Sequence, residues 1–156
     1  MIRKLTAALA VAGAVLLGLA APASAEVQVS PFCQNGAGYQ TRVDIANVVA
    51  TNGVAVGTVE LCRQGSLYFA FALFDQPMTA SQYAQVYLNR YDRGEPVGRV
   101  DCDSPGGNKH IKPGERRCWT PNLNGAASRY TFIASVLQYS SHTGDLLSGG
   151  VTDETR

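Results

Sequence analysis

Hydrophobic and polar residues alternate along most of the chain beyond residue 38, which is the pattern of β-strands with one covered face. Segments rich in Gly, Pro, Asn, Asp or Ser interrupt the alternation and mark turns. The pattern predicts strands at 39–50, 54–62, 67–74, 83–91, 97–102, 129–139 and 146–152. About seven strands at this spacing are typical of an all-β fold, and we expect an antiparallel β-sandwich.

The first two predicted strands are expected to form a hairpin. Asn52-Gly53 lies between them and suits the positive φ angles of a type I′ turn. The alternation places Val43 and Ile45 on the same face of the first strand. In the returning strand it directs Glu60 outward, toward solvent.

Two of the predicted strands depart from simple alternation. Residues 67–74 are apolar on both faces, which predicts a central strand covered on both sides, with Phe69 and Phe71 buried. In 83–91, tyrosines recur every four residues and fit one face of a helix or of a strand. We interpret this segment as a strand, because residues 92–96 resemble a hairpin turn into the next strand.

The N-terminal 25 residues have the pattern of a secretory signal peptide. Arg3 and Lys4 precede an apolar run, and Ala23-Ser24-Ala25 forms a small-residue cleavage site. The chain of 156 residues minus these 25 leaves 131, the size of a single domain, at 26–156. We therefore expect a secreted, extracellular protein with no membrane span after cleavage.

The charge balance argues against some classes of partner. Removal of Arg3 and Lys4 from the thirteen basic residues leaves eleven, against twelve acidic residues, for a net charge of −1. A nearly neutral domain has no general affinity for nucleic acid or for anionic membranes. An extracellular protein or an envelope polysaccharide is the expected partner.

All four cysteines lie beyond the predicted signal peptide. An even number of cysteines in an exported protein indicates disulfides. Three pairings are possible, and Cys33–Cys62 with Cys102–Cys118 is favoured because each then closes a local loop. No C-x-x-C pair is present, and the two histidines are far apart in the sequence, so no metal site and no cofactor are expected.

Around position 60 the sequence resembles a group of small secreted actinobacterial proteins of unknown function. The resemblance rests on Thr58-Val59-Glu60-Leu61, a V-E-L strand before a cysteine, together with the export signal. The chain departs from that group in residues 67–74, which lack its cysteine and tryptophan. The resemblance implies a secreted protein and no particular activity.

Two segments are candidates for binding. As a strand, 83–91 places Tyr83, Tyr87 and Tyr91 on one face, where aromatic rings with polar tips suit sugar rings or a protein partner. The loop 103–117, fastened at its base by a disulfide, is locally basic and contains Lys109 and Lys112. Such a loop suits an anionic wall polymer, or a protease if the protein is a secreted inhibitor.

The evidence for catalysis is weaker. His110 lies among lysines with no evident acid partner, and the Ser and Asp residues around His142 are ordinary turn residues. Sequence alone places no two carboxylates across a cleft, as glycoside hydrolysis needs, and no calcium-loop motif surrounds Asp103. We expect a non-enzymatic binding protein, with a protease inhibitor or a small extracellular hydrolase as alternatives.

Overall fold

The computed structural model describes residues 32–156, so the predicted signal peptide at 1–25 lies outside the described residues. The described chain is all-β and contains no helix. Its strands are β1 (Gln34–Asn35), β2 (Gly38–Tyr39), β3 (Thr41–Ala50), β4 (Ala55–Gln64), β5 (Leu67–Phe74), β6 (Tyr83–Asp92), β7 (Glu95–Asp101), β8 (Arg117–Trp119), β9 (Leu123–Asn124), β10 (Tyr130–Tyr139) and β11 (Leu146–Val151). The seven longest strands correspond to the seven predicted segments, and 83–91 is confirmed as a strand.

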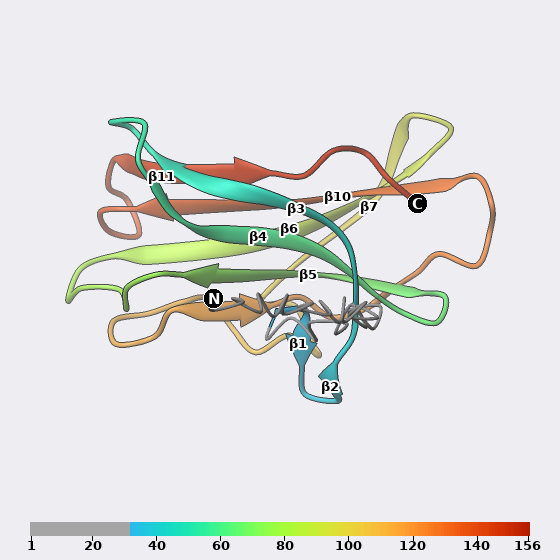
Figure 1. Ribbon diagram of the computed structural model, residues 1–156, viewed down its shortest axis with the longest axis horizontal. Coiled ribbons are helices and arrows are strands. Elements are labelled where there is room, and N and C mark those ends of the chain that lie inside the picture. Colours follow the sequence, from blue (N-terminus) through green and yellow to red (C-terminus); the bar gives the residue numbers. More distant parts are fainter. Residues whose placement is uncertain (1–31) are drawn as a thin grey trace, which may run out of the picture.

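Nine of these strands form one antiparallel sheet in the order β7-β6-β10-β11-β3-β4-β5-β8, with β9 also paired to β5. The sheet folds back on itself, so that β10 and β6 face β4 and β5 across the core (Figure 1). The result lies between a sandwich and a barrel. Strands β1 and β2 form a separate hairpin beside the sheet.

The two edges of the sheet are joined by the segment between β7 and β8. Ile111 in this segment forms an antiparallel bridge with Ala84, which extends the outer edge of β6. The predicted disulfide Cys102–Cys118 then links the end of β7 to β8, and Cys33–Cys62 links the N-terminal segment to β4. Both predicted pairings are confirmed, with Cα–Cα distances of 6.2 and 5.4 Å respectively.

The main core fills the space between the two halves of the folded sheet. It takes alternate residues from the central strands, among them Val59 and Leu61 of β4 and Val86 and Leu88 of β6. Tyr68 and Phe132 stack across this core with ring centres 4.2 Å apart. Alternation along each strand thus buries one face and leaves the other to be covered or solvated.

A second apolar layer covers the opposite face of β4 and β5. Cys33, Cys62, Phe69 and Phe71 are its buried members, and Phe32, Leu73 and Trp119 pack against them. The prediction that β5 is covered on both faces, with Phe69 and Phe71 buried, is therefore confirmed. Glu60 is not exposed as predicted, because its side chain points to this covered face and has no solvent-accessible surface.

Two local predictions for the β3–β4 hairpin are wrong. A register shift between Arg42 and Asp44 inverts the alternation, so Val43 packs against the core while Ile45 is 41% exposed. The turn is not type I′, because Gly53 alone has positive φ (84°). The β6–β7 turn instead has positive φ at both central residues, 54° at Arg93 and 88° at Gly94.

Candidate binding surfaces

The outer face of β6 carries the predicted tyrosines. Ala84, Val86 and Leu88 point into the core, whereas Tyr83, Tyr87 and Tyr91 lie on the opposite face and are half-buried. The Arg99 guanidinium lies 3.9 Å from the centre of the Tyr87 ring, a cation–π contact. The predicted tyrosine face therefore exists, with its rings partly covered by neighbouring side chains.

Both histidines of the chain converge on Tyr83. The Tyr83 ring lies 4.8 Å from His110 and 4.1 Å from His142, measured between ring centres. The two imidazoles are 5.4 Å apart and nearly perpendicular. Tyr139 approaches the same ring at 6.5 Å, because β10 pairs with β6 in a register that places Tyr139 opposite Tyr83.

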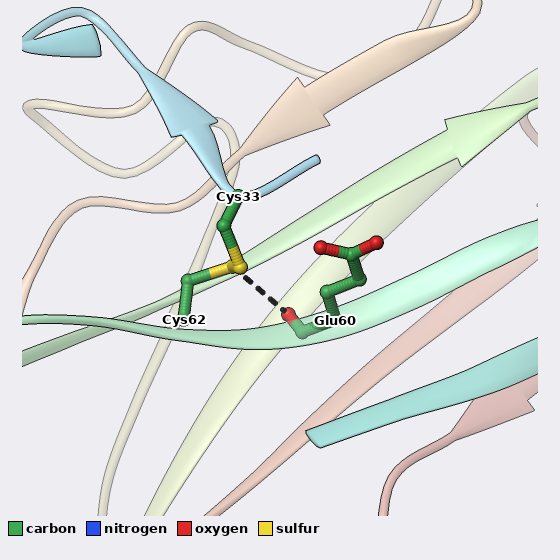
Figure 2. A group of neighbouring side chains, drawn as sticks. All are labelled: Cys33, Glu60 and Cys62. Carbon is green, nitrogen blue, oxygen red and sulfur yellow. Dashed lines mark hydrogen bonds between the residues drawn. A yellow bond between two sulfur atoms is a disulfide. The ribbon is translucent and has the colours of Figure 1, made fainter. Parts of the chain in front are cut away.

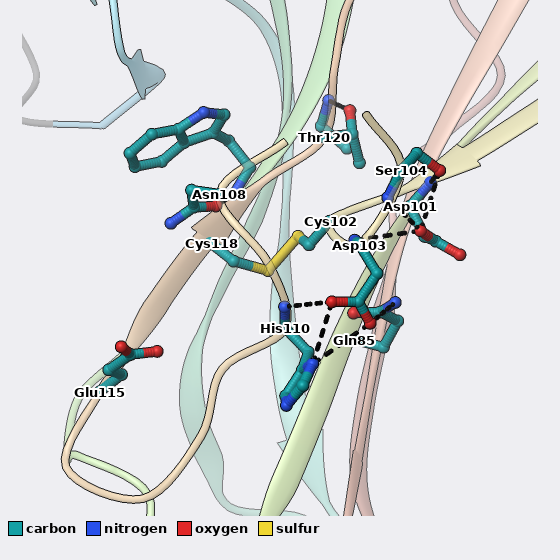
Figure 3. Close-up of a disulfide and its surroundings, with 12 residues drawn as sticks. Gln85, Asp101, Cys102, Asp103, Ser104, Asn108, His110, Glu115, Cys118 and Thr120 are labelled. Carbon is teal, nitrogen blue, oxygen red and sulfur yellow. Dashed lines mark hydrogen bonds and ion pairs between the residues drawn. A yellow bond between two sulfur atoms is a disulfide. The ribbon is translucent and has the colours of Figure 1, made fainter. Parts of the chain in front are cut away.

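His110 has the acid partner that sequence analysis did not find. Nδ1 of His110 lies 3.0 Å from the Asp103 carboxylate, and the His110 backbone N–H donates to it at 3.1 Å (Figure 3). Nε2 of Gln85 donates to the same carboxylate at 3.0 Å. Burial raises the pKa of Asp103. The hydrogen bonds from His110 and Gln85 and the charge of His110 lower this pKa by more than burial raises it, so the net shift is downward. The pKa of Tyr83 rises to about 12, through burial first and the Asp103 charge second.

The loop 103–117 lies against the sheet along part of its length. Ile111 is fully buried, and its N–H donates to the Ala84 carbonyl at 2.9 Å. Lys109 and Lys112 are both exposed, and Lys112 forms a 3.7 Å ion pair with Glu115. Lys109 has a φ of 73°, which reverses the chain and brings His110 back to Asp103. The lysines are thus available to solvent, while the loop that carries them is anchored.

A groove of about 680 Å³ lies on the other side of this loop, over the second apolar layer. We call it the aromatic–arginine groove. Its lining includes Phe32, Gln34, Tyr39, Arg116, Arg117 and Trp119. Tyr39 is 55% exposed, and the Arg117 guanidinium donates to the side chain of Gln34 at 2.8 Å.

The groove was not predicted as a unit, although its basic residues lie in the predicted basic loop. It is assembled from the β1–β2 hairpin, the second-layer face of β5 and the segment leading into β8. These parts are far apart in the sequence and meet because β8 pairs with β5 and the Cys33–Cys62 disulfide fastens the N-terminal segment to β4. The one sequence feature that could have indicated the groove was Trp119, the single Trp of the chain.

Glu60 lies buried beside the Cys33–Cys62 disulfide (Figure 2). The Arg42 guanidinium lies 3.6 Å from its carboxylate. Hydrogen bonds from the Cys33 backbone and from Arg42 favour the charged form of this carboxylate. Burial raises the pKa of Glu60 to about 7, although the positive charge of Arg42 lowers it. Within residues 32–156, Glu60 with the two cysteines forms the one group of three donors close enough to share a metal ion, and the disulfide occupies both sulfurs.

The chain is 29% identical to the uncharacterized protein YjfA of Bacillus subtilis (strain 168) over 107 residues, which are 65% of this chain and 66% of YjfA. The match thus covers just under two thirds of that relative. No protein-family model matches the chain, and no solved structure matches it. None of the described residues forms a helix long and apolar enough to cross a membrane.

Proposed function

We propose that this protein is a secreted, non-enzymatic binding protein that holds an anionic envelope polysaccharide in the aromatic–arginine groove. The observation that carries the proposal is the composition of that concave surface, where the exposed ring of Tyr39 and the half-buried rings of Phe32 and Trp119 adjoin two arginines. Aromatic rings pack on the apolar faces of sugar rings, and arginine binds carboxylate or phosphate groups in a planar, two-point geometry. A polymer that carries acidic groups on sugar rings would satisfy both kinds of side chain.

The volume of the groove is consistent with this use. About 680 Å³ is within the range of roughly 300–1,000 Å³ that ligand sites occupy. Gln34 and Asn108 add planar amides to the lining. Asn108 also accepts a hydrogen bond from the Trp119 backbone N–H at 2.6 Å, so it helps to hold this wall in place.

Binding is better supported than hydrolysis at this groove. Glycoside hydrolysis uses two carboxyl groups across the scissile bond. The described lining contains a single carboxylate, Glu115, which is already paired with Lys112. The Asp103–His110 pair lies on the tyrosine face, and among the described residues no Ser, Thr or Cys side chain is hydrogen-bonded to His110.

The inhibitor alternative has less support. A bait loop must enter the active site of a protease, whereas Ile111 anchors the middle of the 103–117 segment to β6. The two disulfides are typical of an oxidising compartment, which agrees with export but does not identify a partner.

Native affinity electrophoresis tests the proposal. Protein comprising residues 26–156, with its disulfides intact, is run through gels containing polygalacturonic acid or neutral dextran. We expect retardation in the anionic gel alone. The change Tyr39→Ala combined with Arg116→Ala should weaken the retention at least tenfold, because both side chains are groove residues.

The controls separate the groove from the rest of the surface. Arg93→Asn removes a positive charge from the β6–β7 turn and suits its positive φ, so it should bind like the wild type. Tyr83→Ala with Tyr87→Ala tests the tyrosine face, and Lys109→Asn with Lys112→Ala tests the loop lysines. Loss of binding in either of these pairs, with the groove variant unaffected, would move the site away from the groove. No retention by either polymer would contradict the polysaccharide proposal and leave a protein partner.

A further inference from the structure

The two histidines of the chain form a preorganised pair on the outer face of the sheet. His110 comes from the segment between β7 and β8, and His142 from the turn between β10 and β11. Their ring centres are 5.4 Å apart, and Tyr83 packs against both. His142 is exposed, so the pair is open to solvent. Neither imidazole belongs to the aromatic–arginine groove.

Asp103 fixes the orientation of one of these rings. The carboxylate accepts a hydrogen bond from Nδ1 of His110, at 3.0 Å, while Gln85 donates to the same carboxylate (Figure 3). With its proton on Nδ1, neutral His110 carries its free lone pair on Nε2. A carboxylate behind a histidine in this way is the usual arrangement around protein-bound metal ions, where it holds the ring and increases its basicity.

The separation of the rings matches two imidazoles on a single ion. With metal–nitrogen bonds of about 2.0–2.1 Å and tetrahedral angles, the two ring centres lie roughly 5 Å apart. The observed 5.4 Å is close to that separation. Imidazole nitrogen suits zinc, copper and nickel, whereas magnesium and calcium take oxygen ligands.

We propose that His110 and His142 together bind one divalent transition-metal ion, with Zn²⁺ or Cu²⁺ as the preferred class and Asp103 as a positioning residue. Two protein ligands leave the remaining positions to water or to a small-molecule ligand. The site is therefore an exchangeable surface site. It differs from a structural zinc site, which the cysteine spacing argued against and which is four-coordinate and closed.

The experiment uses the imidazole NMR signals of untagged protein comprising residues 26–156. The chain has two histidines, so two sets of ring signals are expected. On addition of ZnCl₂, both sets should change together and stop changing at one equivalent, whereas MgCl₂ should leave them unchanged. His142→Gln, at an exposed position, should abolish the response of His110, and melting curves confirm that this variant is folded.

Asp103→Asn gives a second, independent readout. Loss of a carboxylate behind a metal-bound histidine weakens metal affinity about 10–100-fold. We expect such a loss by calorimetric Zn²⁺ titration, and no change in the control Asp75→Asn, which removes an exposed carboxylate elsewhere. The proposal is overturned if one histidine responds alone, if the response continues beyond one equivalent, or if saturated protein sediments as a dimer bridged by the metal. If Asp103→Asn bound Zn²⁺ with the affinity of the wild type, Asp103 would have no positioning role.

Discussion

Glu60 and Phe71 lie directly opposite each other on β4 and β5, and both side chains are buried on the face of the sheet that points away from the main core. Opposed residues of an antiparallel pair share one face, so a carboxylate adjoins an aromatic layer. An ionised group in such a place loses its hydration, and the Arg42 guanidinium at 3.6 Å compensates only in part. This pair links the stability of the second layer to pH.

The first prediction concerns the pH dependence that Glu60 imposes. Its pKa is 4.5 in the reference state and about 7 in the fold, so between these values the native state binds more protons than the unfolded state. The free energy of unfolding therefore falls as pH rises through this window, and the contribution of the protonated carboxyl is lost above pH 7. Glu60→Gln should remove this dependence and stabilise the protein at pH 8 by about 1–3 kcal/mol.

Urea unfolding of both proteins at pH 5 and pH 8 measures the effect, with Glu115→Gln as an exposed control. Arg42 is 39% exposed and stays solvated when its partner is neutralised. A Glu60→Gln protein that is less stable than the wild type at pH 8 would contradict the prediction.

The second prediction concerns the aromatic layer itself. Phe71 is 1% exposed and belongs to the buried second layer. Phe71→Ala should lower the free energy of unfolding by about 3–5 kcal/mol, the range for deletion of a buried ring. Val97 is 45% exposed, so Val97→Ala should change the free energy of unfolding by less than about 0.5 kcal/mol. Urea unfolding with intact disulfides makes the comparison, and a loss below about 1 kcal/mol in Phe71→Ala would place this layer at the surface.

The strands could be predicted because alternation and turn residues are local signals. Leu67–Phe74 was predicted with its exact bounds, since its apolar run ends at a Gly-Ser turn on one side and before Pro77 on the other. Glu60 was misjudged because alternation tells which face a residue points to, and not whether that face is covered. The cover comes from Cys33 and its neighbours, which are remote in the sequence. Ile45 was misplaced by a bulge, for which the sequence carries no clear signal.

The candidate sites could not be predicted without knowing the order of the strands in the sheet. His142 meets Tyr83 because β10 pairs with β6, and His110 meets it because Lys109 reverses the chain after β7. The groove likewise depends on β8 pairing with β5. The sequence correctly placed the tyrosines on one strand face, but it could not show which distant side chains would cover them.

The third prediction separates the roles of the two disulfides. Cys102→Ser with Cys118→Ser should lower the free energy of unfolding by about 2–4 kcal/mol, the usual contribution of a bridge. Because this bridge holds the segment that contains Ile111, the Ile111 amide should also exchange faster with solvent. Cys33→Ser with Cys62→Ser should leave that amide protected, since this bridge lies in the other apolar layer. Amide exchange followed by NMR makes the comparison, and equal deprotection in both variants would contradict it.

The fourth prediction concerns processing at the N-terminus. Ala23-Ser24-Ala25 closes the apolar run of the predicted signal peptide, so cleavage should follow Ala25. N-terminal sequencing of protein from the culture medium should then begin at Glu26. Intact Met1 on a membrane-bound product would show that the segment is retained as an anchor.

The last prediction tests whether the tyrosine face is part of the core. Tyr83 and Tyr87 are half-buried, whereas Ala84, Val86 and Leu88 on the other face of β6 are fully buried. Removal of both rings deletes the contacts of Tyr83 with the histidines and the cation–π contact of Tyr87 with Arg99. Surface pairs of these kinds each contribute about 0.5–1 kcal/mol, so loss of the three contacts in Tyr83→Ala with Tyr87→Ala should cost about 1.5–3 kcal/mol.

Thermal and urea unfolding should therefore still show one cooperative transition for this double variant. The matched comparison is Phe71→Ala, where a single ring from the second layer should cost more than both tyrosines together. If the double variant instead fails to fold, the tyrosines carry packing energy like that of core rings. The β6 face would then be structural, and a role for it in binding would have to be abandoned.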